Sequence, residues 1–214
     1  MPLIETSIHG AIHELRLARP PVNALNPELC EALAQALDDA VATGAQGIVL
    51  AGGPKVFSAG LDVPYLLSLG DDQDALLAAW TVFFKAARAL VACPVPVVAA
   101  LAGHSPAGGC VLALCCDYRI MAEGPYRIGL NETQVGLVAP EGIQSLLARM
   151  VGAHRAERLL VAGEMVDAAE ALRIGLVDEL TGIDEVATRA RTWREALLQL
   201  PRAPMLQTRR SARA

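Results

Sequence analysis

The sequence predicts a single α/β domain in which short buried strands alternate with helices. Two apolar runs bounded by glycine or proline, Gly47–Ala51 and Pro94–Leu101, each follow a segment with helical periodicity. A turn rich in small residues comes after each run. The composition, 53% hydrophobic and 19% charged over 214 residues, is typical of a folded chain that buries one substantial core.

The first elements are a strand and a capped helix. Alternation over Ile12–Leu17 predicts a strand, and the Pro20-Pro21 pair then breaks regular structure. Leucines spaced three to four residues apart predict a helix from Pro27. Asn26 is placed to cap its start, and Gly44 lies just past its end.

The middle of the chain continues the alternation. A helix around Leu76–Leu90 precedes the Pro94–Leu101 strand, whose prolines stand at its entrance, where they cost least. A compact apolar helix over Cys110–Cys116 and a strand over Tyr118–Ala122 come next. The remainder is predicted to be mainly helical, with helices over 140–151, 153–162, 168–174 and 184–200 and a short strand over 176–178.

Charge and cysteine usage exclude several function classes. The formal net charge is −5, and no basic stripe suits a phosphate backbone, so nucleic acid is not an expected partner. Arg209, Arg210 and Arg213 gather near the C-terminus and are interpreted as a solvated tail without a function. The five cysteines offer no metal or redox spacing, and we expect them to be small buried side chains in a reducing compartment.

The N-terminus and the hydropathy pattern predict a cytoplasmic protein without a membrane partner. The first residues lack the basic region and apolar stretch of a secretion signal. No uninterrupted apolar span is expected to be long enough to cross a bilayer.

Two loops of small residues are candidates for binding an anion. In Phe57–Asp62 and in Pro106–Gly109, small residues precede a helical turn or helix, which leaves backbone N–H groups free. Each loop alone is better explained as a tight turn. Together they offer two separate backbone donors, which is what stabilising an enolate oxygen requires.

Glu132 is the candidate base. It lies among apolar neighbours in Gly129–Leu137, where desolvation would favour the neutral carboxyl and bring its pKa closer to the working pH. The alternative is a solvated loop glutamate. His104 also lies near the second loop, but the chemistry does not require it, whereas Asp117 and Tyr118 are interpreted as structural.

In order and spacing, three segments resemble the crotonase, or enoyl-CoA hydratase/isomerase, superfamily, and in particular its mitochondrial-type Δ3,Δ2-enoyl-CoA isomerase branch. The segments are Ser58–Asp62, Pro106–Cys110 and Gly129–Gln134, with supporting matches at Arg19-Pro20 and Gly175–Asp178. The resemblance implies a ClpP/crotonase fold of repeated β-β-α units. It also implies one domain over 1–214, with a core over about 1–180 and a helical C-terminal region over 181–214. That region is shorter than in the relatives, and a naturally short chain and an incomplete one stay open as explanations.

The resemblance also assigns roles to residues. The backbone N–H groups of Leu61 and Gly108 would form the oxyanion hole, and Glu132 would carry a proton from C2 to C4 of a 3-enoyl-CoA in fatty acid β-oxidation. Contacts to coenzyme A, mainly through backbone groups, would come from Val22, Ala24, Ser58, Ala59, Gly60 and Asp62, and Asn131 would orient the acyl chain or serve only its own turn.

One position separates two reactions of the superfamily. Hydratases place a second glutamate shortly after the glycine pair, and Val111 occupies that position here. A valine cannot deprotonate water, so isomerisation is favoured. Another crotonase-type reaction (weak hydratase, lyase or thioester hydrolase) and a non-catalytic acyl-CoA-binding subunit stay open as alternatives.

The resemblance further implies an acyl-CoA substrate and assembly into homotrimers or hexamers. Coenzyme A would arrive as part of the substrate, with no tightly bound cofactor and no metal.

Overall fold

The computed structural model describes residues 2–213 as an α/β fold built on one large sheet. Its strands are β1 Ile4–His9, β2 Ile12–Leu17, β3 Gly47–Ala51, β4 Val97–Leu101, β5 Ser105–Pro106, β6 Tyr118–Ala122, β7 Arg127–Gly129, β8 Val166–Asp167 and β9 Glu179–Thr181. Its helices are α1 Pro27–Ala42, α2 Val63–Ser68, α3 Gln73–Ala92, α4 Gly108–Cys115, α5 Glu141–Val151, α6 Ala153–Ala162, α7 Ala168–Ile174, α8 Val186–Leu198 and α9 Arg202–Arg213, with short 3₁₀ turns η1 Glu132–Val135 and η2 Ile183–Glu185.

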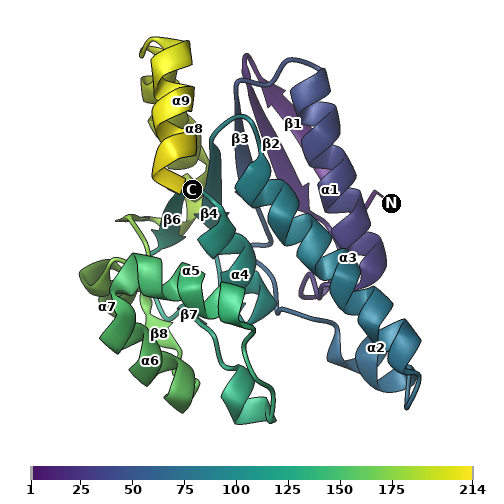
Figure 1. Ribbon diagram of the computed structural model, residues 1–214. Coiled ribbons are helices and arrows are strands. Elements are labelled where there is room, and N and C mark those ends of the chain that lie inside the picture. The colour runs from purple at the N-terminus through teal and green to yellow at the C-terminus, as the bar shows by residue number, and fades with distance from the viewer. Residues whose placement is uncertain (1, 214) are drawn as a thin grey trace.

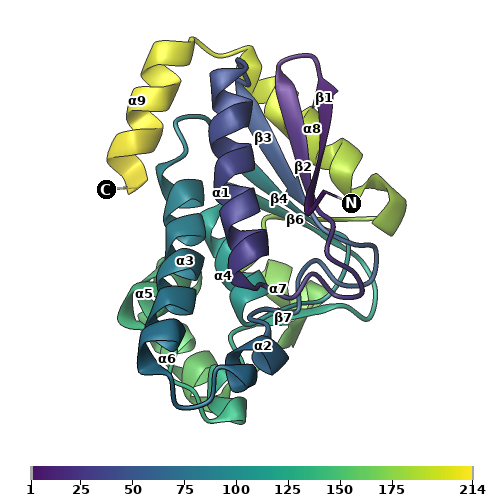
Figure 2. The ribbon, with the colours of Figure 1, turned by 90° about the vertical axis from the view of Figure 1, so that its right-hand side faces the viewer.

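The main sheet has the strand order β1-β2-β3-β4-β6-β9 (Figure 1). Only β1 and β2 pair antiparallel; the other neighbours are parallel. One face is covered by α1, α3 and α4, and α8 covers the other (Figure 2). The central strands β3 and β4 are therefore buried on both faces, which explains why they are apolar at every position.

The sequence-based elements are largely confirmed. The strands β2, β3 and β6 have the predicted bounds, and α1 begins at Pro27 as expected. The side chain of Asn26 caps α1 by accepting from the backbone N–H of Leu29 at 3.0 Å. The predicted Pro94–Leu101 strand begins only at Val97, after its prolines. All five cysteines are free and buried.

The predicted strand over Leu176–Asp178 is wrong. The strand β9 begins at Glu179, directly after the end of the predicted strand. Leu176 and Val177 are buried, but both of their N–H groups donate to the carbonyl of Ala171 in the middle of α7. Their apolar character reflects packing in the core and not strand pairing.

The interpretation of the C-terminal arginines as a solvated tail is wrong for Arg209 and Arg213, whereas Arg210 is exposed. All three lie on α9, which stands on the face of the sheet opposite α8, across a cavity from the C-terminal ends of α1 and α3 (Figure 2). Arg209 and Arg213 both form ion pairs with Asp117, at 2.6 and 2.7 Å, and each side chain is only 14% exposed. Asp117, predicted to be structural, is thus the anchor of the last helix.

Helix α3 differs from expectation in one further respect. It is 20 residues long with a mean hydropathy of 1.6, so by length and composition it could span a membrane. A core helix of a globular fold passes the same test. Here Phe83, Ala86 and Leu90 are buried in the main core, and Lys85 and Arg88 interrupt the apolar sequence.

A small second sheet holds the loops beyond the main sheet together. Its order is β5-β7-β8, and β5 pairs with β7 through Ser105–Ile128 and Pro106–Gly129. Because β5 leads into α4 and β7 leads into the Glu132 turn, this pairing brings those two segments side by side.

Candidate active site

The two glycine-containing loops leave the same edge of the main sheet. Strands β3 and β4 are adjacent and parallel, with Ala51 opposite Ala100, so the loops that follow them emerge together. The first loop is held by a bridge between Leu25 and Leu61, and the second by the pairing of β5 with β7. Ligands of open α/β sheets bind at such carboxyl ends of strands.

The backbone N–H groups of Leu61 and Gly108 lie close together. A Cβ atom added at Gly108 would stand 3.3 Å from the Leu61 nitrogen, and one added at Gly60 would stand 2.9 Å from the Gly108 nitrogen. Gly60 also has φ +86°, which favours glycine. Within residues 2–213, neither of the two N–H groups has a hydrogen-bond acceptor. This pair of free donors has the form of an oxyanion hole.

Glu132 begins the 3₁₀ turn η1, which is fastened to α6. The hydroxyl of Thr133 donates to the carbonyl of Leu160 at 3.1 Å, and the amide of Gln134 lies 3.4 Å from the carbonyl of Ala162. The turn ends at Gly136, which has a left-handed conformation with φ 75°. The two side chains that follow Glu132 therefore hold the turn that carries it against α6.

Glu132 and the two free N–H groups share one cavity of about 170 Å³. Oε2 of Glu132 and Oδ1 of Asn131 are both buried, and neither has a hydrogen-bond partner within residues 2–213. Burial raises the pKa of the Glu132 carboxyl above its ordinary value, and a hydrogen bond from its own backbone offsets this in part. The alternative of a fully solvated glutamate does not describe this side chain.

Five of the sequence-predicted site residues line this cavity: Ala59, Leu61, Gly108, Asn131 and Glu132. The other five, Val22, Ala24, Ser58, Gly60 and Asp62, are not part of its lining. Ser58, Gly60 and Asp62 belong to the first loop, and Val22 and Ala24 to the segment that pairs with it; together they form a layer behind the cavity lining. Whether any of them contacts coenzyme A stays a prediction.

The polar groups of this layer hold the loop in shape. The buried hydroxyl of Ser58 donates to the carbonyl of Asn23 at 2.8 Å and accepts from the N–H of Gly60 at 3.2 Å. The carboxylate of Asp62 pairs with Arg19 at 2.6 Å and also caps α2.

Backbone carbonyls complete the layer. The carbonyl of Val22 accepts from the N–H of Ala59 at 2.9 Å, and that of Ala24 accepts from the Arg19 guanidinium at the same distance. The Leu61 N–H is thus presented by a loop whose other polar groups are mostly paired internally.

Sequence reasoning missed the apolar wall of the cavity. Trp80 and Phe83 of α3 line it, together with Ile143 of α5 and Leu137 after η1. The rings of Trp80 and Phe83 meet edge to face, with centroids 6.1 Å apart. A signal was present, since Trp80, Phe83 and Phe84 are three of the chain's five Trp and Phe residues and lie within five positions.

His104 lies outside the cavity lining. Its Nδ1 accepts from the backbone N–H of Arg127 at 3.1 Å, and its ring meets that of Tyr126 edge to face. These contacts tie the second loop to β7. They agree with the expectation that the chemistry does not use this histidine.

The cavity that holds Glu132 is not the largest one. A cavity of about 720 Å³ lies at the opposite end of the sheet, between α9 and the segments that precede β3 and β4. Four arginines of α9 line it, and no carboxylate is among the described residues of its lining. We therefore place the candidate active site in the smaller cavity.

Comparison with known protein families gives a match over almost the whole chain. The family described as enoyl-CoA hydratase/isomerase matches residues 7–214. The mouse protein named "Enoyl-CoA delta isomerase 1, mitochondrial" is 37% identical over 202 residues, which cover 93% of this chain and 69% of that protein. Its human counterpart is 35% identical, and the match spans 63% of its length, less than two thirds.

Relatives named as hydratases match at a similar level. A probable enoyl-CoA hydratase of Mycobacterium avium is 35% identical over 88% of this chain and 72% of its own length. Among solved structures, human mitochondrial delta3-delta2-enoyl-CoA isomerase superposes with a TM-score of 0.91 at 33% identity, covering 99% of this chain and 84% of that one. A Bacillus anthracis enoyl-CoA hydratase also gives 0.91, at 26% identity, with 98% and 82% covered.

Proposed function

The chain belongs to the enoyl-CoA hydratase/isomerase family, and within this family of enzymes we propose that it is an isomerase that shifts the double bond of a 3-enoyl-CoA to the 2-trans position. Both isomerases and hydratases are among the similar proteins, so likeness alone does not choose the reaction. The choice rests on the chemistry of the candidate active site.

The observation that carries the proposal is that Glu132 is the single ionisable side chain among the described residues that line the cavity. Hydration of a double bond needs water to be held and deprotonated, which is easiest with a second polar group beside the first. Val111 occupies the position at which hydratases carry their second glutamate. Its side chain is 1% exposed and presents only methyl groups to the cavity. One base without a water-holding partner suits a proton transfer that consumes no water.

The proposed reaction moves one proton within the substrate. The thioester oxygen lies between the N–H groups of Leu61 and Gly108, and the Glu132 carboxylate removes a proton from C2. The electrons of that C–H bond enter a dienolate whose negative charge is stabilised by the two donors. Glu132 then returns the proton to C4, so the double bond moves from C3–C4 to C2–C3 and the carboxylate is restored.

The raised pKa of Glu132 supports this role. A carboxyl held in a partly desolvated cavity is a stronger base than one in water, and its unpartnered Oε2 has no internal donor to satisfy it. The same carboxyl, once protonated, is a competent donor to C4. A single group can therefore serve both steps.

Product analysis of the unaltered protein tests the proposal. With a trans-3-enoyl-CoA we expect the 2-trans-enoyl-CoA as product, and with 2-trans-enoyl-CoA we expect little 3-hydroxyacyl-CoA. Hydration faster than isomerisation would refute the choice of reaction. Thioester cleavage would point to a hydrolase, and acyl-CoA binding without any turnover would point to a binding subunit.

A further inference from the structure

A second, apolar space lies beside the cavity that holds Glu132. A groove of about 530 Å³ lies between α3 and α5, and it shares Val111, Pro140 and Ile143 with the cavity that holds Glu132. The two spaces are thus adjacent along the same wall. We call the second one the tail groove.

Helix α4 provides a continuous edge from the oxyanion hole to the tail groove. Gly108 lines the catalytic cavity, Val111 lines both spaces, and Cys115 lines the tail groove. These positions are three and four residues apart, so they lie along one face of the helix. At 1.5 Å per residue, the stripe is about 10 Å long.

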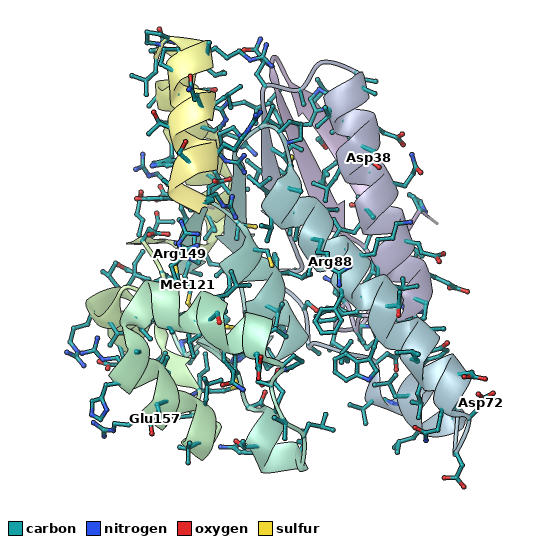
Figure 3. The ribbon with its side chains drawn as sticks, in the orientation of Figure 1. Asp38, Asp72, Arg88, Met121, Arg149 and Glu157 are labelled. Atoms are coloured by element: carbon teal, nitrogen blue, oxygen red, sulfur yellow. The ribbon has the colours of Figure 1, made fainter. Side chains whose placement is uncertain are left out.

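The lining of the tail groove is almost entirely apolar. From α3 it receives Phe84, Ala87 and Val91, and from α5 it receives Leu146. Burial raises the pKa of the Cys115 thiol to about 12, so this side chain is neutral near pH 7. The one charged residue among the described lining is Arg88, whose side chain is exposed beside α3 (Figure 3). An alkyl chain fits such a lining, and an ionic or hydrogen-bonding ligand does not.

From these observations we propose that the tail groove holds the distal part of the substrate's acyl chain, so that the enzyme prefers long-chain over short-chain acyl-CoAs. This inference rests on the proposed function. With the thioester oxygen held at Leu61 and Gly108, the acyl chain passes Glu132 and then Val111 into the groove. Val111 therefore has a second role: it gives the path of the acyl chain an apolar wall, where a glutamate would place a carboxylate.

Gly142 offers a way to fill the groove without disturbing the fold. It lies in the first turn of α5 and lines the groove, and a Cβ atom added there would meet nothing within 4 Å. Its backbone needs no special conformation, and glycine is a poor helix former, so a larger residue is tolerated. Gly142→Phe should occupy the space of the tail, with Gly142→Leu as a milder variant.

The test is equilibrium binding of two saturated acyl-CoAs, hexanoyl-CoA and dodecanoyl-CoA, which the proposed reaction cannot convert. Each methylene transferred from water to the groove is worth about a four-fold gain in affinity. We expect the unaltered protein to bind dodecanoyl-CoA at least tenfold more tightly, with Gly142→Phe reducing that ratio to about twofold. Ser145→Phe, on an exposed position of α5 outside the groove lining, is the matched control and should keep the ratio.

Three results would overturn the inference. Equal affinity of the unaltered protein for the two ligands would show that the groove does not hold the tail. An unchanged ratio in both Gly142 variants would place the tail elsewhere. The third result combines two measurements: Gly142→Phe dissociates an oligomer in sedimentation, and tail length has no effect on acyl-CoA affinity. It would assign the groove to a second copy of the chain. Because binding needs no turnover, a failed isomerase assay would refute the proposed function without deciding this one.

Discussion

At the scale of single residues, the site depends on how closely two backbone nitrogens approach. Gly108 stands at the start of α4, where the first N–H groups of a helix have no partner inside the helix. The Leu61 nitrogen faces the same space because Gly60 allows the loop to turn beside it. The account therefore makes a prediction for a change as small as one methyl group.

Gly108→Ala should lower isomerase activity strongly while preserving the fold. The added Cβ would lie 3.3 Å from the Leu61 nitrogen and 3.1 Å from a methyl group of Leu25, so it would cover one donor of the oxyanion hole. Loss of one such donor costs about 10² to 10³ in kcat. Steady-state kinetics and a thermal melt measure the two effects.

Gly182→Ala is the control, because its added Cβ meets only the Glu185 carboxylate, at 3.8 Å, and its φ of −58° suits any residue. If Gly108→Ala kept activity within a few-fold of the unaltered protein, the oxyanion hole would not be where we place it.

The raised pKa of Glu132 predicts the pH dependence of the reaction. The base must be ionised, so kcat should rise with pH through the Glu132 pKa and reach a plateau. Because burial raises that pKa, the midpoint should lie above the value of about 4.3 for an ordinary glutamate. A midpoint at or below the ordinary value would contradict the buried base.

The same shift has a consequence for stability. A carboxyl whose pKa is higher in the folded than in the unfolded state costs stability as pH rises through the folded-state pKa. Glu132→Gln should therefore have a higher free energy of unfolding than the unaltered protein near neutral pH. At about pH 3 the difference in free energy of unfolding should vanish, because the carboxyl is protonated in both the folded and the unfolded state. Denaturant titrations at the two pH values measure this.

At the scale of elements, α9 is fastened by one carboxylate. Asp117 accepts from the side chains of Arg209 and Arg213 and from the backbone N–H of Val97 at 2.8 Å. The two arginines also donate to the carbonyls of Cys93 and Cys115, at 2.7 and 2.6 Å. Asp117 therefore connects the start of β4 to the last helix.

Asp117→Ala should destabilise the protein and release α9. Removing the carboxylate leaves two mostly buried guanidinium groups and a backbone N–H without their acceptor, at a cost of about 2–4 kcal/mol. Urea denaturation measures the cost, and hydrogen exchange reports on α9. Asp71→Ala, at an exposed loop position, should change stability by less than about 0.5 kcal/mol. An equally small effect of Asp117→Ala would mean that α9 is not held there.

The elements also show what sequence patterns predict and what they leave out. Local signals located β2, α1 and β3, because alternation, a capping Asn26 and an apolar run each act within a few residues. The β9 strand was misplaced because Leu176 and Val177 are apolar for packing. Pairing of Asp117 with arginines 92 and 96 positions away leaves no local trace in the sequence.

The candidate site divides in the same way. Glycine-rich loops and a glutamate among apolar residues can be recognised locally, and Leu61, Gly108 and Glu132 do share one cavity. The wall formed by Trp80 and Phe83 and the tail groove beyond Val111 arise only when α3, α4 and α5 pack together. Tertiary packing decides their positions, so sequence reasoning did not find them.

At the scale of the whole molecule, the sheet separates two kinds of site. Its strand ends after β3 and β4 present the cavity that holds Glu132, and its opposite end carries the arginine-lined cavity under α9. The two layers of helices enclose β3 and β4, so the catalytic loops start from the most buried strands. Assembly into trimers or hexamers stays a prediction from the family resemblance, and sedimentation would test it.

The central claim is that Glu132 carries the proton between C2 and C4, and the most direct measurement is turnover of a trans-3-enoyl-CoA by Glu132→Gln beside the unaltered protein. The change keeps the size of the side chain and removes the base. We expect kcat to fall by about 10² to 10⁴, the usual contribution of general acid–base catalysis, with the affinity for a saturated acyl-CoA unchanged. Turnover by Glu132→Gln within a few-fold of the unaltered protein would contradict the account.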